Sequence, residues 1–195
     1  DVIFGESEVD PAEGVLTPFS SDSSDSALEA YHRVLEITRQ LDLTLFPDIT
    51  DTVSQVHFQL GKLYLQQQEY DQVITHMKQI GSKREMGLPS TQLTGVQYGL
   101  GVAYQQTDQL EEAIKAYNRV LQLQEDSLTP MKWPIVNFYL GLAYSQTNQY
   151  DLAINAHKKA LAHYKGDWRI TFHLGLAYYQ LRNFALASKS FETQI

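Results

Sequence analysis

The chain has 195 residues, of which 43% are hydrophobic and 19% charged, a composition that suits one folded domain or a short repeat array rather than a disordered segment. It contains no cysteine, which excludes disulfides, thiolate metal sites and cysteine catalysis and suits a reducing compartment, so we expect a cytoplasmic location. No apolar run approaches the roughly 20 residues of a membrane span, so we expect no membrane insertion.

The net charge of −8 is concentrated at the start of the chain. Residues 1–26 hold seven of the 23 acidic residues and no Lys or Arg, whereas the other 169 residues carry 16 acids against 15 bases. A nucleic-acid-binding surface needs clustered cations that face the phosphates. The nearly neutral body therefore predicts no nucleic acid among the partners.

The first segment, residues 1–24, is predicted to be an acidic flexible leader. It combines acids with two prolines, two glycines and a run of Ser and Asp, and such a composition buries too little apolar surface to offset its chain entropy. Scattered apolar residues such as Phe4, Leu16 and Phe19 leave a second interpretation open. In that interpretation the leader is an acidic-hydrophobic segment that docks on this chain or on a partner.

The first predicted helix lies in residues 25–46. Ser26 and Glu29 have the spacing of a capping box, in which each side chain bonds the backbone N–H of the other residue. Apolar residues then follow at helical intervals, namely Leu28, Tyr31, Leu35 and Leu41. We expect the helix itself to cover about 25–43 and to stop before Pro47.

From residue 47 onward the chain repeats one pattern four times. Each copy has Leu-Gly with Tyr three residues after the glycine, and the glycines are Gly61, Gly101, Gly141 and Gly175. Three further positions recur at nine, twelve and sixteen residues after the glycine. They hold Tyr70, Leu110, Tyr150 and Phe184, then Val73, Ala113, Ala153 and Ala187, and last Met77, Tyr117, His157 and Phe191. Four matches to one composite pattern indicate a true internal repeat.

This pattern resembles the tetratricopeptide repeat, whose motif is Leu-Gly-x-x-Tyr on a first helix and Ala-x-x-x-aromatic on a second. The resemblance implies an all-α fold, a right-handed α-solenoid of stacked antiparallel helix pairs. The four pairs are expected at about 47–86, 87–126, 127–166 and 167–195. Leu and Tyr share one face of the first helix, and Gly lets the second helix come close. One such pair cannot bury its own core, so at least three are needed.

The spacing departs from the usual length of 34 residues. Successive glycines are 40, 40 and 34 residues apart, so we expect longer loops or an added turn around 81–90 and 125–134. Arrays of this kind normally end in a polar capping helix, which is missing before residue 195. We therefore expect a fragment of a longer protein and a last repeat that is open to self-association.

A second stripe lies about 200° around each first helix from the core stripe. In tetratricopeptide arrays this face lines the concave groove and binds peptides or partner helices, so the resemblance implies a partner-binding site here. Rings supply buried area, and amides can meet backbone donors or acceptors. The candidate residues are Phe58, Lys62, Leu65, Gln66, Tyr98, Val102, Gln106, Phe138, Leu142, Gln146, Phe172, Leu176, Tyr179 and Gln180. The alternative is that the aromatic residues pack sideways against the next repeat and contact no ligand.

No pattern of catalytic residues stands out. The six histidines occur singly, and no phosphate loop, nucleophile elbow or metal motif is present. We therefore expect no enzyme activity, no metal and no cofactor. The resulting hypothesis is an adaptor, scaffold or assembly factor that binds a protein or peptide in the groove. A peptide-responsive sensor domain and a structural spacer in a larger assembly remain as alternatives.

Overall fold

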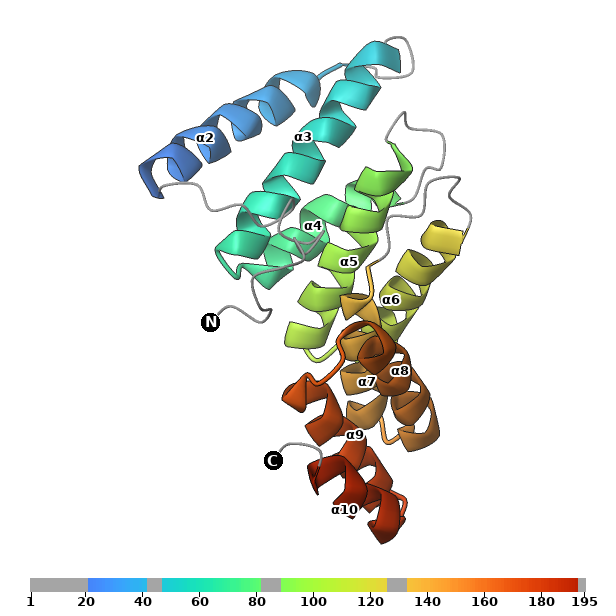
Figure 1. Cartoon of the computed structure of the whole chain (residues 1–195). Helices are drawn as coiled ribbons and strands as arrows, with labels where there is room; N and C mark the ends of the chain where they lie inside the picture. The colour runs from blue at the N-terminus through green and yellow to red at the C-terminus, as the bar shows by residue number, and fades with distance from the viewer. Residues whose placement is uncertain (1–20, 42–46, 82–88, 126–132, 193–195) are drawn as a thin grey trace.

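The computed structural model describes residues 21–41, 47–81, 89–125 and 133–192; most of the expected leader and of both expected long loops lies outside them. These described residues form nine α-helices and no strand (Figure 1). The helices are α2 (Ser21–Thr38), α3 (Pro47–Gln66), α4 (Tyr70–Gly81), α5 (Ser90–Gln106), α6 (Leu110–Glu125), α7 (Ile135–Gln146), α8 (Tyr150–His163), α9 (Trp168–Gln180) and α10 (Phe184–Glu192).

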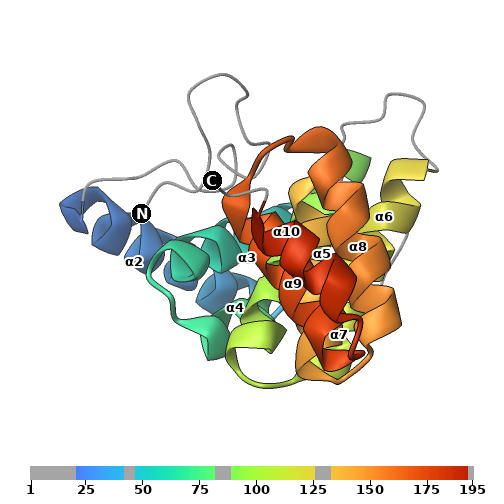
Figure 2. The same ribbon diagram turned by 60° about the horizontal axis from the view of Figure 1, so that its bottom comes forward.

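Helices α3 to α10 form four pairs, and each pair packs on the next. Helix α3 pairs with α4, α5 with α6, α7 with α8 and α9 with α10. The second helix of each pair also contacts the first helix of the following pair, and the first helices α3, α5, α7 and α9 are neighbours in turn. Figures 1 and 2 show the pairs as successive steps of one array. The repeat pattern predicts this all-α arrangement of stacked helix pairs.

The stripe predicted as the core is buried on every first helix. On α3, the side chains of Val56, Leu60 and Leu63 are only 6%, 0% and 5% exposed. Fully burying a side chain of this size contributes roughly 1.5–3 kcal/mol. The positions of Val56 and Leu60 recur on α5, α7 and α9. The residues there are also buried, and they are Val96, Leu100, Val136, Leu140, Ile170 and Leu174. This continuous apolar stripe holds one helix pair on the next.

Close contact within each pair depends on the repeated glycine. A Cβ atom added to Gly61 would lie 2.6 Å from the Met77 side chain, a separation that real Cβ atoms essentially never show. The same bulky position meets the glycine in every pair, as Met77 on Gly61, Tyr117 on Gly101, His157 on Gly141 and Phe191 on Gly175. Any other residue at the glycine position would force the bulky side chain, or the helix that carries it, to move.

The turn within each pair is also repeated, although the sequence pattern does not reveal it. The seventh residue after each glycine has a φ of 58–62°, and these residues are Gln68, Asp108, Asn148 and Arg182. The following residue donates its N–H to the carbonyl of the repeat's Tyr, as from Gln109 to Tyr104 at 2.8 Å. Asp and Asn visit this left-handed conformation more readily than Gln or Arg. The packing of the pair therefore imposes the turn on Gln68 and Arg182, whose residue types rarely adopt it.

Helix α2 lies beside α3 at the start of the array (Figure 1). It begins at Ser21, four residues before the expected start, and ends at Thr38, where the Thr38 hydroxyl donates to the Val34 carbonyl at 2.9 Å. His32 on α2 and the Tyr64 hydroxyl on α3 lie 2.8 Å apart. This polar contact fixes the position of α2 against the first complete pair.

Replacing Gly101 with Ala is expected to destabilise the protein by about 1–3 kcal/mol, because the new methyl group would overlap the Tyr117 ring. In an ordinary helix interior the same change stabilises by roughly 1 kcal/mol, so the sign of the effect tests the contact. Urea unfolding followed by circular dichroism measures it. In a Tyr117→Leu background the loss should become much smaller, whereas an unchanged loss would show that the glycine contact is not its cause.

Candidate functional site

Ten of the fourteen candidate residues keep part of their side chain accessible, and we call this set the open face. They occupy equivalent positions on neighbouring first helices, so they lie along one side of the array. The half-buried members are Lys62, Gln66, Val102 and Leu142, and the exposed members are Gln106, Gln146, Phe172, Leu176, Tyr179 and Gln180. These ten side chains are therefore accessible on the surface of the array.

Four candidate residues are buried and do not line an open groove. Their side chains are only 4–7% exposed, and they are Phe58, Leu65, Tyr98 and Phe138. The expected aromatic ladder must be corrected at these positions. The rings there pack inside the array, as the alternative interpretation of the sequence proposed, because the neighbouring repeat covers them.

The residues that cover these rings come from the next first helix or from just before it. The Tyr98 ring centroid lies 5.1 Å from that of Trp133, which precedes α7, and 6.0 Å from that of Tyr139 on α7. The Phe138 ring lies 5.7 Å from His173 on α9. Such tilted and edge-on ring pairs contribute about 0.5–1.5 kcal/mol beyond their buried area. The rings thus help to set how each pair is rotated on the next.

The last described repeat leaves its aromatic residues open. Phe172 is 38% exposed, Tyr179 55% and Phe184 59%. The Phe172 ring rests on Phe191 of its own pair at 6.0 Å, but no further first helix follows α10 among the described residues. This end of the array presents an apolar surface of the kind that the next repeat covers elsewhere.

The amide groups of the open face are partly linked across repeats. Gln105 Nε2 donates to Gln146 Oε1 at 2.8 Å, and the Tyr117 hydroxyl donates to Gln105 Oε1 at 3.0 Å. The bond between the two glutamines is exposed to water, so it contributes little net stability. Instead it orients amide groups that could exchange this bond for one to a ligand backbone.

The open face carries little charge. Lys62 is its only charged member, and the Lys62 ammonium lies 6.0 Å from the centre of the buried Phe58 ring, within reach of a cation–π interaction. A ligand for this face therefore needs no strong charge of its own.

Three histidines from different helices meet beside Tyr64, although they are far apart in the sequence. His32 contacts the Tyr64 hydroxyl, and His57 Nδ1 lies 3.0 Å from His76 Nδ1. Burial of His76, followed by the neighbouring His57 and His32, lowers the pKa of His76 to about 4, so this ring is neutral at pH 7. No group of histidines and carboxylates within the described ranges could hold a metal ion. The cluster joins α2, α3 and α4 by ring packing.

His157 fills the bulky position of the third pair and is completely buried. Its ring lies 5.8 Å from Phe138 and 5.9 Å from His173. Neither ring nitrogen forms a hydrogen bond with the described residues. Burial, followed by the nearby His173, lowers the pKa of His157 to about 3. This histidine therefore acts as a packing residue that tolerates protonation poorly.

The family comparison identifies the repeats. Residues 93–166 match the family model of the tetratricopeptide repeat, which confirms the resemblance seen in the sequence. The matched region begins within α5 and extends beyond α8, so it covers two helix pairs. A search of curated proteins found no match.

Solved structures extend the same fold to nearly the whole chain. The crystal structure of MamA is 24% identical, covers 89% of this chain and 87% of its own, and has a TM-score of 0.69. YrrB, described as a TPR protein with an unusual peptide-binding site, is 14% identical, covers 89% of this chain and 79% of its own, and has a TM-score of 0.67. The chain therefore has the predicted tetratricopeptide-repeat solenoid fold. Within the described ranges, no helix is long and apolar enough to cross a bilayer.

Replacing His157 with Met is expected to make the protein less sensitive to acid. The pKa of His157 is lower in the folded state than its ordinary value of 6.5, so the unfolded state binds more protons and stability falls as the pH drops from 6.5 towards 3. Met fills a similar volume, as at the same position in the first pair, and cannot take up a proton. The Tm of the variant minus the Tm of the unmodified protein should therefore become more positive as the pH falls from 7.5 to 4.5.

The matched control is His163→Met on the same helix, because His163 is exposed. This control should leave the pH dependence of Tm unchanged. An equal effect of the two substitutions would contradict a special role for the buried ring.

Proposed function

We propose that the open face binds a segment of another protein, so that the chain acts as an adaptor, scaffold or assembly factor without catalytic activity. The single observation that carries this proposal is the recurrence of an accessible amide side chain on four neighbouring first helices and of an accessible apolar side chain on three of them. A ligand that lies across α5, α7 and α9 meets the same chemistry at each step.

The chemistry of the face favours a peptide or a partner helix over a small polar molecule. Val102, Leu142 and Leu176 offer apolar area in a row, and Gln106 and Gln146 beside them offer both donors and acceptors. An extended or helical segment has backbone groups and side chains that repeat along its length in a comparable way. The peptide-binding site named for YrrB gives this proposal added support.

Two further expectations from the sequence belong to this proposal. The exposed aromatic rings of α9 and α10 support self-association through the last repeat. The complete lack of cysteine supports a cytoplasmic location.

Replacing Leu176 with Glu should weaken binding of a protein segment by at least about tenfold, because a carboxylate would replace apolar contact area on the open face. A ligand can be selected from a library of displayed peptides, and its affinity for each variant can then be measured by isothermal calorimetry. Leu176 is 38% exposed, so the helical content in circular dichroism should hardly change.

Leu152→Glu provides the control for this substitution. Leu152 is 45% exposed on α8, a second helix that lies outside the open face. Binding should survive this control substitution. If both substitutions weaken binding equally, or neither does, the open face is not the binding site.

A further inference from the structure

Helix α2 takes the place of a second helix whose first helix is missing from the described residues. In each complete junction, the residue after the bulky position contacts the Tyr of the next first helix. The ammonium groups of Lys78 and Lys158 lie 5.7 Å and 5.6 Å from the centres of the Tyr104 and Tyr178 rings. Asn118 Nδ2 donates to the Tyr144 hydroxyl at 3.3 Å. On α2, His32 contacts the corresponding Tyr64, with His32 Nε2 2.8 Å from the Tyr64 hydroxyl. In this register Tyr31 takes the bulky position. Ala27, four residues earlier, takes the small position, which Ala113 holds in the second pair.

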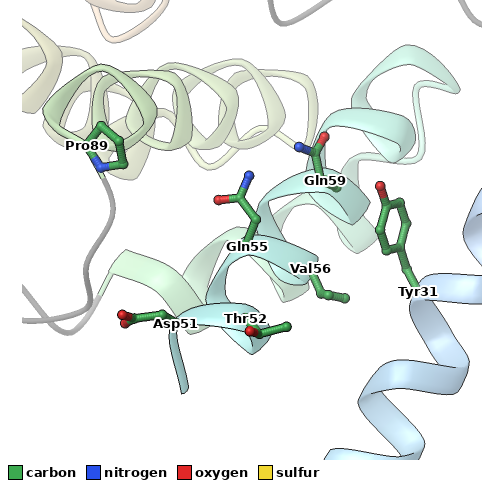
Figure 3. Close-up of a pocket in the computed structure, with 7 residues that line it drawn as sticks. All are labelled: Tyr31, Asp51, Thr52, Gln55, Val56, Gln59 and Pro89. Atoms are coloured by element: carbon green, nitrogen blue, oxygen red, sulfur yellow. The ribbon is translucent and has the colours of Figure 1, made fainter. Parts of the chain in front are cut away.

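Tyr31 lines a cavity where a complete repeat has its first helix. Elsewhere the bulky side chain lies against the glycine of that helix, as Tyr117 does against Gly101. The cavity has a volume of about 430 Å³ and is lined by Tyr31, Asp51, Thr52, Gln55, Val56, Gln59 and Pro89. Figure 3 shows Tyr31 on α2 facing Val56 and Gln59 on α3, with Pro89 on the opposite side. We call this cavity the α2–α3 groove.

The wall formed by α3 has the same register. In the third and fourth pairs, the residue two before the glycine contacts the preceding first helix. The ring centroids of Tyr139 and Tyr98 lie 6.0 Å apart, and those of His173 and Phe138 lie 5.7 Å apart. The equivalent residue on α3 is Gln59, which lines the groove. The α2 wall therefore has the register of three other junctions of this array, and the α3 wall has the register of two of them.

We infer that the α2–α3 groove binds in trans an amphipathic α-helix of a partner protein, which completes a fifth repeat. The occupant resembles the chain's own first helices α5, α7 and α9, so it is 12–17 residues long. It places Gly over the Tyr31 ring, and its contact face is uncharged because Gln55 and Gln59 are neutral. A basic side chain at its edge would meet the Asp51 carboxylate.

The sequence immediately before α2 lacks the first-helix motif in this register. The interval of twelve residues between the glycine and the small position puts Val15 at the glycine position and Pro18 at the tyrosine position. Any side chain at the glycine position would collide with the bulky residue, and proline interrupts a helix interior. This mismatch favours an occupant from another molecule over residues 1–20.

A fluorescein-labelled peptide with the sequence of residues 90–106, which form α5, tests the inference when the full chain is titrated into it. Saturable binding is expected in fluorescence anisotropy. The same peptide with Gly101→Leu should bind at least about tenfold more weakly, because the leucine side chain would overlap the Tyr31 ring. Equal affinity of the two peptides, or no binding of either, would overturn the inference.

Matched protein variants locate the bound peptide. Gln59→Glu places a charge against the apolar peptide and should weaken its binding at least about fivefold, whereas Gln72→Glu, on an exposed site of α4, should not. Leu176→Glu should also leave this binding unchanged, which separates the groove from the open face. Weakening by Leu176→Glu but not by Gln59→Glu would move the peptide to the open face and refute the inference.

Two further outcomes would assign the groove to another occupant. Binding that appears only after deletion of residues 1–20 would mean that the chain's own leader fills the groove. A dimer in sedimentation velocity that Gln59→Glu dissociates would mean that a second copy fills it. Either result would overturn the proposal of a partner helix.

Discussion

The contact between a glycine on one helix and a bulky side chain on its partner is the constraint on which the rest of the array depends. It brings the paired helices so close that an added Cβ atom at Gly61 would lie 2.6 Å from Met77. This approach buries the small residue at the facing position, as at Ala113, and lets the apolar stripe of one pair reach the next. Because the bulky residue can be Met, Tyr, His or Phe, the constraint concerns space and not chemistry. His157 shows the cost of that tolerance, since its ring nitrogens lie buried without a partner among the described residues.

Stacking of successive pairs decides which side chains remain available for binding. Rings such as Tyr98 and Phe138 are covered by the following repeat, and the positions beside them on each first helix stay open. The accessible surface is therefore less aromatic than the sequence suggests and richer in amides and aliphatic side chains. Such a surface suits a ligand with a regular backbone. The array can hold this surface rigid because each ring contact also restricts rotation between pairs.

The two ends of the described array differ in what they expose. At the α10 end, the rings of Phe172 and Phe184 are exposed, and no further helix covers them among the described residues. At the α2 end, α2 lies against α3 without a first helix before it among the described residues, and the α2–α3 groove lies between the two helices. A repeat array stabilises each unit through its neighbours, so both ends have surface whose burial would stabilise the fold. Binding at an end would therefore be coupled to the stability of the terminal pair.

The sequence by itself determined the repeat, its helix pairs, the buried stripe and the role of the glycine, because these features depend on residues that share one helix face or recur at a fixed interval. Only the tertiary structure decided that Phe58, Tyr98 and Phe138 are buried, that three histidines meet at Tyr64, and that α2 packs on α3 in the register of a second helix. The covering residue Tyr139 lies 41 residues after Tyr98 in the sequence. Helical periodicity assigns a residue to a face of its own helix. It does not show which neighbouring helix covers that face, because this depends on the rotation between packed pairs.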